Sequence, residues 1–259
     1  YSAGDTPFPW EMNMWYHTLN CGFRTRISGE TDFPCIFDER VGVARSYFKP
    51  GQKLDYTGYI TALKNGRSYV SEGNAHIIDF AVNGIEVGTK DSEVRLAKAA
   101  SVKISAKVAA LLPEQQSEEA AMLAQRRLDR QPYWNIERSR IGNSRKVGVE
   151  LIVNGNAVDT VVITADGAWK NISFDYTADR SSWVALRIFA SVHTNPIFVL
   201  VDNKPVYIAK SAEWCAAALD QCWKMKVNGI REAERTAAKA AYDKARVYYQ
   251  AIINEADKK

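Results

Sequence analysis

The sequence predicts an α+β fold that is mostly β, in three stretches: 1–75, 76–209 and 210–259. Near the N-terminus apolar residues recur at steps of three and four, which is typical of one face of a helix. Across the middle of the chain they alternate with period two between turn dipeptides, which predicts an antiparallel β-sandwich. Towards the C-terminus an alanine-rich helical spacing returns and predicts an αα-hairpin.

The first predicted element is a helix that ends close to a glycine. Its apolar face consists of Met12, Trp15, Tyr16 and Leu19. Gly22 follows, and glycine enters the left-handed region after a helix without a steric penalty. Residues 23–28 alternate around arginines and predict a short strand, after which comes Asp32. Residues at the carboxyl end of a barrel strand face the active site, although an aspartate after a strand is also a common turn or capping residue.

A second helix is predicted over residues 54–63, whose apolar members are Leu54, Tyr59, Ile60 and Leu63. Asn65 and Gly66 end it, because both residue types tolerate the left-handed conformation that terminates many helices. Residues 68–71 then predict a strand that leads into the central stretch.

Alternation with period two extends from His76 to about Ile208 and predicts about eight short strands. Two Asn-Gly pairs, at 83–84 and 154–155, predict tight hairpins because both residue types accept positive φ. Residues 202–205 predict a further hairpin turn. Before the second Asn-Gly pair, alternate side chains are apolar and are expected to point into the core: Val147, Val149, Leu151 and Val153.

One polar insertion, residues 113–132, interrupts this alternation. Its acidic residues come first and its arginines last, an order that favours a short helix through the helix dipole. We expect it to be a solvated surface excursion.

The C-terminal stretch predicts two helices joined by a tight turn. Ser211 is expected to cap the first, which would bury a stripe made of Trp214, Ala218 and Cys222. The second runs over about 230–256, with a narrow apolar face made of Ile230, Ala233, Ala237, Ala241, Tyr248 and Ile252.

The composition is that of a globular protein, with 46% hydrophobic and 25% charged residues among 259. No apolar run approaches the ~20 residues that a membrane-spanning helix needs. The net charge of +4 is small and the basic residues are interspersed with acids, so nucleic-acid binding has no support. The four cysteines do not make a disulfide framework, and we expect buried thiols that pack as small apolar residues.

Several segments, in this order along the chain, resemble one enzyme family. They are Trp15, Leu19-Asn20, Gly22, Arg24, Thr31-Asp32, Arg45, Tyr47, Phe48, the run 66–73 (GRSYVSEG), His193 to Val199, and Ser211 to Cys215. This set resembles the C-terminal part of PHP-type metallohydrolases, and within them the carbaryl-hydrolase-like CehA/McbA family. Pro34 stands where that family has a histidine, and the sequence contains no counterpart of the family's upstream His-x-His.

The resemblance implies that residues 1–75 are the C-terminal remnant of a PHP-type α/β barrel. It implies a metal-dependent hydrolase, in which metal-activated water attacks an ester, carbamate or phosphoester bond. The intact enzyme would hold a divalent ion, zinc or manganese, and this chain alone is expected to be inactive because it supplies few ligands. The partners expected are the upstream half of the barrel or another subunit, a small-molecule substrate, and a further copy of the chain.

The candidate site residues are carboxylates, a histidine and arginines. Asp32 would be both the catalytic residue and a metal ligand, and the further metal ligands would be Glu30 and His17. Guanidinium groups hold carboxylate or phosphate with two hydrogen bonds, so three arginines are candidates for binding substrate: Arg24, Arg45 and Arg67. Surface salt bridges are the alternative role for these arginines, and packing or turn formation for the others.

The alternative function is a non-catalytic β-sandwich module that binds carbohydrate or a protein partner. Four aromatic residues in or beside the predicted strands would form its platform if exposed: Tyr133, Trp134, Trp169 and Trp183. Aromatic side chains in strands more often belong to the core, so their exposure distinguishes the two interpretations.

Overall fold

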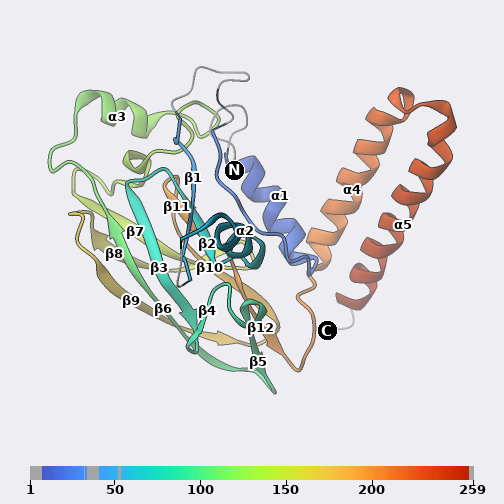
Figure 1. Cartoon of the computed structure of the whole chain (residues 1–259), viewed down its shortest axis with the longest axis horizontal. Coiled ribbons are helices and arrows are strands. Elements are labelled where there is room, and N and C mark those ends of the chain that lie inside the picture. The colour runs from blue at the N-terminus through green and yellow to red at the C-terminus, as the bar shows by residue number, and fades with distance from the viewer. Residues whose placement is uncertain (1–7, 32, 34–40, 52–53, 257–259) are drawn as a thin grey trace. The chain divides into compact units, whose positions relative to one another are not determined.

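The structure is a computed structural model, and it describes residues 8–31, 33, 41–51 and 54–256. The chain forms two compact units, the first made of residues 1–13 and 26–204, the second of residues 14–25 and 205–259. The first unit holds two sheets, and the second holds the C-terminal helices (Figure 1). The α+β class with mostly antiparallel sheets is therefore confirmed.

The larger sheet has eight strands in the order β1-β2-β11-β10-β12-β5, with β7 pairing with β10 and β8 pairing with β7. All of its pairs are antiparallel except β12 with β5, which are parallel. Its strands are β1 (Arg45–Phe48), β2 (Ser68–Ser71), β5 (Glu93–Leu96), β7 (Lys146–Val153), β8 (Asn156–Thr164), β10 (Ser182–Ile188), β11 (Val192–Thr194) and β12 (Ile197–Val201).

The smaller sheet has four antiparallel strands in the order β4-β3-β6-β9. Its strands are β3 (Ala75–Val82), β4 (Ile85–Glu86), β6 (Ala100–Ala110) and β9 (Lys170–Ala178). Apolar side chains of both sheets form one shared core, as in a β-sandwich. The four residues of β7 that were expected to point inward are all buried: Val147, Val149, Leu151 and Val153. Each such side chain stabilises the fold by about 1.5–3 kcal/mol when it leaves water.

Both Asn-Gly pairs form the predicted hairpins. Asn83 and Gly84 have φ of 48° and 77°, and Asn154 has φ of 49° beside Gly155 at 92°. These positive values match the twist of the flanking strands. The hairpin predicted at residues 202–205 is wrong, because the turn there leads into a helix and not into a returning strand.

Outside the C-terminal tail, the described residues form the helices α1 (Phe8–Asn20), α2 (Tyr56–Asn65) and α3 (Glu118–Gln125). Asp55 caps α2 by accepting a hydrogen bond from the Gly58 amide, and Gly66 ends the helix with φ of 74°. Ser117 caps α3, which is the short helix predicted in the polar insertion. Short 3-10 turns occupy Lys90–Ser92, Ile136–Ser139 and Val227–Gly229.

The apolar face predicted for α1 is buried, and Leu19 is fully so. The strand predicted over residues 23–28 does not form. Side chains replace the ladder that a neighbouring strand would supply there: the Ile27 amide donates to Oδ1 of Asn195 and the Gly29 amide to Oγ of Ser46. The segment is thereby fixed without being part of a sheet.

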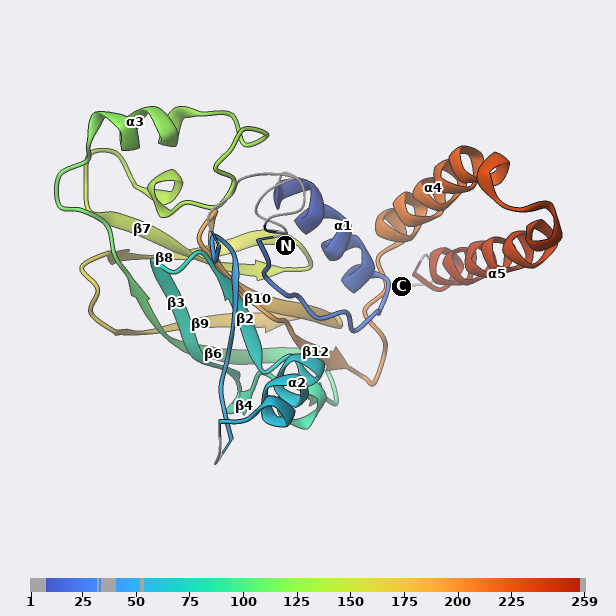
Figure 2. The ribbon, with the colours of Figure 1, turned by 45° about the horizontal axis from the view of Figure 1, so that its top comes forward.

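Helices α4 (Ala209–Lys226) and α5 (Glu232–Ala256) form the predicted hairpin (Figure 2). The stripe of Trp214, Ala218 and Cys222 is exposed, so that prediction is wrong. The buried residues of α4 are Ser211, Ala212 and Cys215. Ser211 does not cap the helix, because its Oγ lies 3.0 Å from Nδ1 of His17 and accepts a hydrogen bond from Nδ2 of Asn20. These polar contacts explain why α4 buries the face that carries Ser211 and not the predicted stripe.

The face predicted for α5 is only partly correct. Ile252 is buried, but Ala233, Ala237 and Ala241 are exposed. No helix in the described part of the chain is long and apolar enough to cross a membrane.

Candidate functional site

Three segments that are far apart in the sequence meet on neighbouring strands of the first unit. In β1 and β2, Arg45 lies opposite Ser71 and Tyr47 opposite Tyr69. On the other edge of β2, Val70 lies opposite His193 of β11. These are the segments 45–48, 66–73 and 193–199 of the family resemblance, so its central residues lie together in space.

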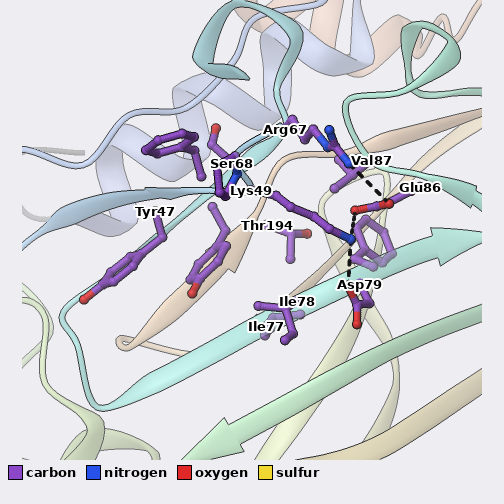
Figure 3. Close-up of a pocket in the computed structure, with 14 residues that line it drawn as sticks. Tyr47, Lys49, Arg67, Ser68, Ile77, Ile78, Asp79, Glu86, Val87 and Thr194 are labelled. Carbon is purple, nitrogen blue, oxygen red and sulfur yellow. Dashed lines mark hydrogen bonds and ion pairs between the residues drawn. The ribbon is translucent and has the colours of Figure 1, made fainter. Parts of the chain in front are cut away.

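A cavity of about 270 Å³, which we call the aromatic cavity, opens beside these strands (Figure 3). Its walls are mostly apolar and include four rings, those of Tyr47, Phe48, Tyr69 and Phe80. Ile77 and Ile78 of β3 lie along one side (Figure 3). A mostly apolar cavity with a few fixed polar groups is the usual form of a small-molecule site.

A ring of charges stands at one end of the aromatic cavity. The ammonium group of Lys49 lies 2.9 Å from Asp79 and 2.7 Å from Glu86 (Figure 3). Lys107 also pairs with Asp79, at 3.2 Å, and Arg67 lies 3.8 Å from Glu86. Hydrogen bonds to Glu86 and Asp79 raise the pKa of Lys49, and the bond from Lys49 lowers the pKa of Asp79. These ion pairs therefore favour the charged form of Lys49.

A β-bulge places Asp79 in this ring. The register between β3 and β6 shifts between Ile78 and Ala81, where β3 has one extra residue. Asp79 takes a φ of 54° there, a conformation that aspartate accepts more readily than most side chains. A bulge re-aims the side chains around it, and this one directs the Asp79 carboxylate towards Lys49 and Lys107.

The tyrosine wall of the cavity is held by a histidine. The rings of Tyr47 and Tyr69 stack with centroids 5.2 Å apart, and the Tyr69 hydroxyl lies 2.8 Å from Nδ1 of His76. Burial raises the pKa of Tyr69 and lowers that of His76. Both groups are thus neutral near pH 7, and one hydrogen bond joins the phenol to the imidazole. This pairing fixes the wall without creating a charged acid or base.

A second cavity in the same unit, the polar cavity, has a volume of about 560 Å³. Arg45, Glu72 and Arg126 are its charged lining residues among those that the structure describes. Glu72 accepts hydrogen bonds from Ser191 and Asn74, at 2.7 and 2.6 Å, and burial raises its pKa.

The predicted site residues fall in different places. Arg45 lines the polar cavity, whereas Arg67 lines the aromatic one. Arg24 belongs to the second unit and is exposed, and Glu30 is exposed in the first. The ring of His17, in the second unit, stacks on Trp214 at 4.3 Å between centroids.

Asp32 and Pro34 lie outside the described residues. Among the residues that are described, no three His, Cys, Asp or Glu side chains stand close enough to hold a metal ion. The described donors therefore do not fit a metal site by themselves. Comparison of the chain with models of known protein families, with curated proteins and with solved structures finds no match.

The structure gives little support to an exposed platform made of the four aromatic residues named above. Tyr133, Trp134 and Trp183 are buried, and Trp169 alone of the four is exposed, at 51%. The sequence reasoning missed Lys49, Asp79 and Glu86. One signal pointed to them: the Asn83-Gly84 hairpin sets Glu86 opposite Ala81, close along the strand to Asp79.

Proposed function

We propose that the first unit is a non-catalytic binding module for a small molecule, and that the ligand occupies the aromatic cavity. The observation that carries this proposal is the combination of aromatic walls with a fixed ring of charges at one end. Every charged group of that ring takes part in an ion pair. The ion pairs raise the pKa of Lys49, which makes its ammonium group a poor proton donor and leaves little neutral amine to act as a base. The ring therefore suits hydrogen bonding and orientation better than proton transfer.

The size and charge of the cavity limit the ligand class. A volume of about 270 Å³ lies at the lower end of small-molecule sites, which fits a single or fused ring. Lys107 pairs with Asp79 but does not line the cavity. Among the charged residues that do line it, Lys49 and Arg67 are balanced by Asp79 and Glu86, so the lining favours an uncharged ligand over an ion. We therefore propose a neutral, ring-containing molecule with one hydrogen-bonding group that meets Lys49 or Glu86.

Titration with indole, phenol and a methyl glucoside, followed by NMR, tests the proposal. Saturable shifts of Tyr69 and Ile78 resonances are expected with at least one of these probes. Ile78→Trp should fill the cavity and abolish them, whereas Val158→Trp, on the exposed face of β8, should leave them intact. Absence of saturable shifts with all three probes, or their persistence in a folded Ile78→Trp protein, would contradict the proposal.

A second candidate function rests on the family resemblance, and the meeting of its segments on β1, β2 and β11 favours it. In this proposal residues 1–75 are the remnant of a PHP-type barrel, and the chain is the C-terminal portion of a metal-dependent hydrolase. Asp32 would supply one ligand for zinc or manganese, and the upstream half of the barrel, or another subunit, the others.

Metal analysis of the chain, followed by an aryl-ester assay with added zinc or manganese, tests this second candidate. The chain alone is expected to bind no stoichiometric metal and to show no turnover. Joining the segment encoded upstream should restore both, and Asp32→Asn should then abolish turnover. If the longer protein neither binds metal nor turns over, the hydrolase assignment is wrong.

A further inference from the structure

We propose that the polar cavity is a second binding site, which takes a small oxyanion, a carboxylate or a phosphate, on the guanidinium group of Arg45. This site goes beyond the proposed function, because its residues and its ligand class differ from those of the aromatic cavity. Polar side chains dominate its lining, among them Arg45, Arg126, Asn74 and Asn135.

Two glycines leave room for the Arg45 guanidinium. A Cβ on Gly42 would lie 2.7 Å from Nε of Arg45, and a Cβ on Gly73 would lie 2.4 Å from Nη1. Both glycines have positive φ, +82° and +107°, so other residues are disfavoured there on conformational grounds too. Nη1 also donates to the Tyr47 hydroxyl at 3.2 Å. The glycines thus give the guanidinium its space and the Tyr47 hydroxyl orients it, which lowers the entropic cost of binding.

The charges of the polar cavity favour an anion. Arg45 has no carboxylate at ion-pair distance within the described part of the chain. Arg126 adds a second guanidinium, and Glu72 is the one carboxylate in the described lining. That carboxylate accepts hydrogen bonds from Ser191 and Asn74, and the charge of Arg45 offsets part of the rise that burial causes in its pKa. Two guanidinium groups against one carboxylate leave an excess of positive charge in the described lining. A guanidinium binds a carboxylate or phosphate with two parallel hydrogen bonds.

The loop that carries Arg126 is itself fixed. Arg138 donates from Nη1 to the carbonyl of Arg126 at 2.9 Å, from Nη2 to that of Arg130 at 2.8 Å, and from Nε to that of Pro132 at 3.1 Å. Arg126 in turn donates to the Gln131 carbonyl at 3.1 Å. One arginine therefore ties together a loop that contributes to the lining of the polar cavity.

An NMR titration of the full chain with inorganic phosphate and with acetate, against sodium chloride at matched ionic strength, tests this site. Saturable shifts of the Gly42 and Gly73 amides are expected with at least one oxyanion, and the stronger probe identifies the ligand class. Arg45→Gln should weaken binding about tenfold or more, as expected for the loss of hydrogen bonds to a charged group. Arg95→Gln removes an equal charge from the exposed Arg95–Glu93 pair and should leave binding unchanged.

If Arg45→Gln does not fold, Arg126→Gln on the surface loop provides the same test, with a severalfold loss expected. Equal shifts with chloride, or undiminished binding in a folded arginine variant, would overturn the oxyanion site. Titration of the Arg45→Gln variant with indole tests the aromatic cavity separately. Indole shifts that survive in this variant show that the two cavities bind their ligands independently.

A different observation, in the second unit, carries a second proposal: we infer that Cys21 and Cys215 form a reversible disulfide. Their sulfur atoms lie 3.9 Å apart, and the two thiols are 0% and 7% exposed. Cys21 follows the end of α1 and Cys215 lies in α4. Ser211, one helical turn before Cys215, contacts both His17 and Asn20, so the two thiols are held facing each other.

Two balanced steps form the bond when a peroxide is the oxidant. The hydrogen bond from Cys21 lowers the pKa of Cys215, which makes Cys215 the thiolate that attacks. Its sulfur displaces hydroxide from hydrogen peroxide and becomes a sulfenic acid. The Cys21 sulfur then attacks that sulfur, and the hydroxyl leaves as water with the thiol proton. A thiol reductant reverses the bond by exchange.

Peroxide treatment, alkylation in denaturant and mass spectrometry test this pair. The protein should lose the mass of two hydrogen atoms, and a proteolytic peptide should join Cys21 to Cys215. Cys222→Ser is the matched control and should keep the cross-link, because Cys222 is exposed and contacts the Tyr242 hydroxyl instead. Cys21→Ser should stop at a sulfenic acid on Cys215 that a dimedone-type reagent captures. A cross-link to another cysteine, or no loss of mass, would overturn the proposal.

Discussion

The imidazole of His17 stacks on the indole of Trp214, with 4.3 Å between ring centroids and 15° between the ring planes. A stack covers one face of the indole, and Trp214 remains 37% exposed. Trp214→Ala should therefore lower the free energy of unfolding of the second unit by about 1–2 kcal/mol, less than the ~3–5 kcal/mol of a core aromatic. Urea unfolding measures the change. Ile252→Ala, at a buried position, is the comparison and should cost about 2–5 kcal/mol. Equal losses for both variants would place Trp214 in the core.

Stability should fall in mild acid because of His193. Burial is the main cause that lowers its pKa to about 3, with the Arg187 charge adding to it. The folded protein therefore keeps His193 neutral, while the unfolded chain takes up a proton near the ordinary value of about 6.5. This contribution to stability is complete above about pH 6.5 and is lost as the pH falls towards 3, by about 1.4 kcal/mol for each pH unit.

Unfolding in urea between about pH 7.5 and 5.5 measures that slope, and His193→Gln should flatten it. The less buried His76 and His17 have lowered pKa values too, so a smaller slope of the same sign remains. Glu72 has a raised pKa and gives the opposite trend at lower pH. An unchanged slope in the variant would mean that His193 is charged in the folded protein.

Two substitutions at Asp79 separate its charge from its backbone conformation. Asp79→Asn removes the charge but retains a residue that tolerates positive φ, so stability should change by less than about 1 kcal/mol. Asp79→Ala loses both and should cost about 1–2 kcal/mol. Thermal unfolding of the two variants gives the comparison. Equal effects would show that the bulge imposes no conformational demand.

Arg138 should control the order of the loop at 126–132. Its guanidinium donates to the carbonyl groups of Arg126, Arg130 and Pro132, and burial lowers its pKa. Arg138→Met should leave those carbonyls without their donor and lower stability by about 1–3 kcal/mol. Hydrogen exchange should show faster exchange in the loop and little change in β6. Arg127→Met, at an exposed position of the same loop, should alter neither.

Local chemistry explains what could be predicted from the sequence. Asn83-Gly84 and Gly66 adopt positive φ wherever they occur in such turns, and the alternation around Val149 needs only one buried face. The orientation of α4 could not be predicted, because Ser211 finds its partners near residue 20, almost two hundred positions away. The strand expected at 23–28 failed for a similar reason, since Asn195 supplies the hydrogen bond that a neighbouring strand would have given.

Part of each candidate site could likewise be predicted from the sequence, and part could not. Arg45 was identified because an arginine suits an anion, but the space that Gly42 and Gly73 leave for it depends on how the segments around residues 42–45 and 73 fold together. The ring of Lys49, Asp79 and Glu86 was missed because a bulge, which leaves no clear mark in the sequence, turns the Asp79 carboxylate towards its partners.

The pairing of β2 with strands on both sides also has a consequence for biosynthesis. One edge of β2 meets β1, which precedes it closely, but the other meets β11, whose Val192 is synthesised more than a hundred residues after its partner Ser71. At ribosomal speeds of about 5–20 residues per second, that edge stays open for roughly 5–25 seconds. During that time a nascent β1–β2 pair can form hydrogen bonds with a strand of another chain. Ribosomes that stall after β2 and before β11 would prolong the exposure of this unpaired edge and favour aggregation.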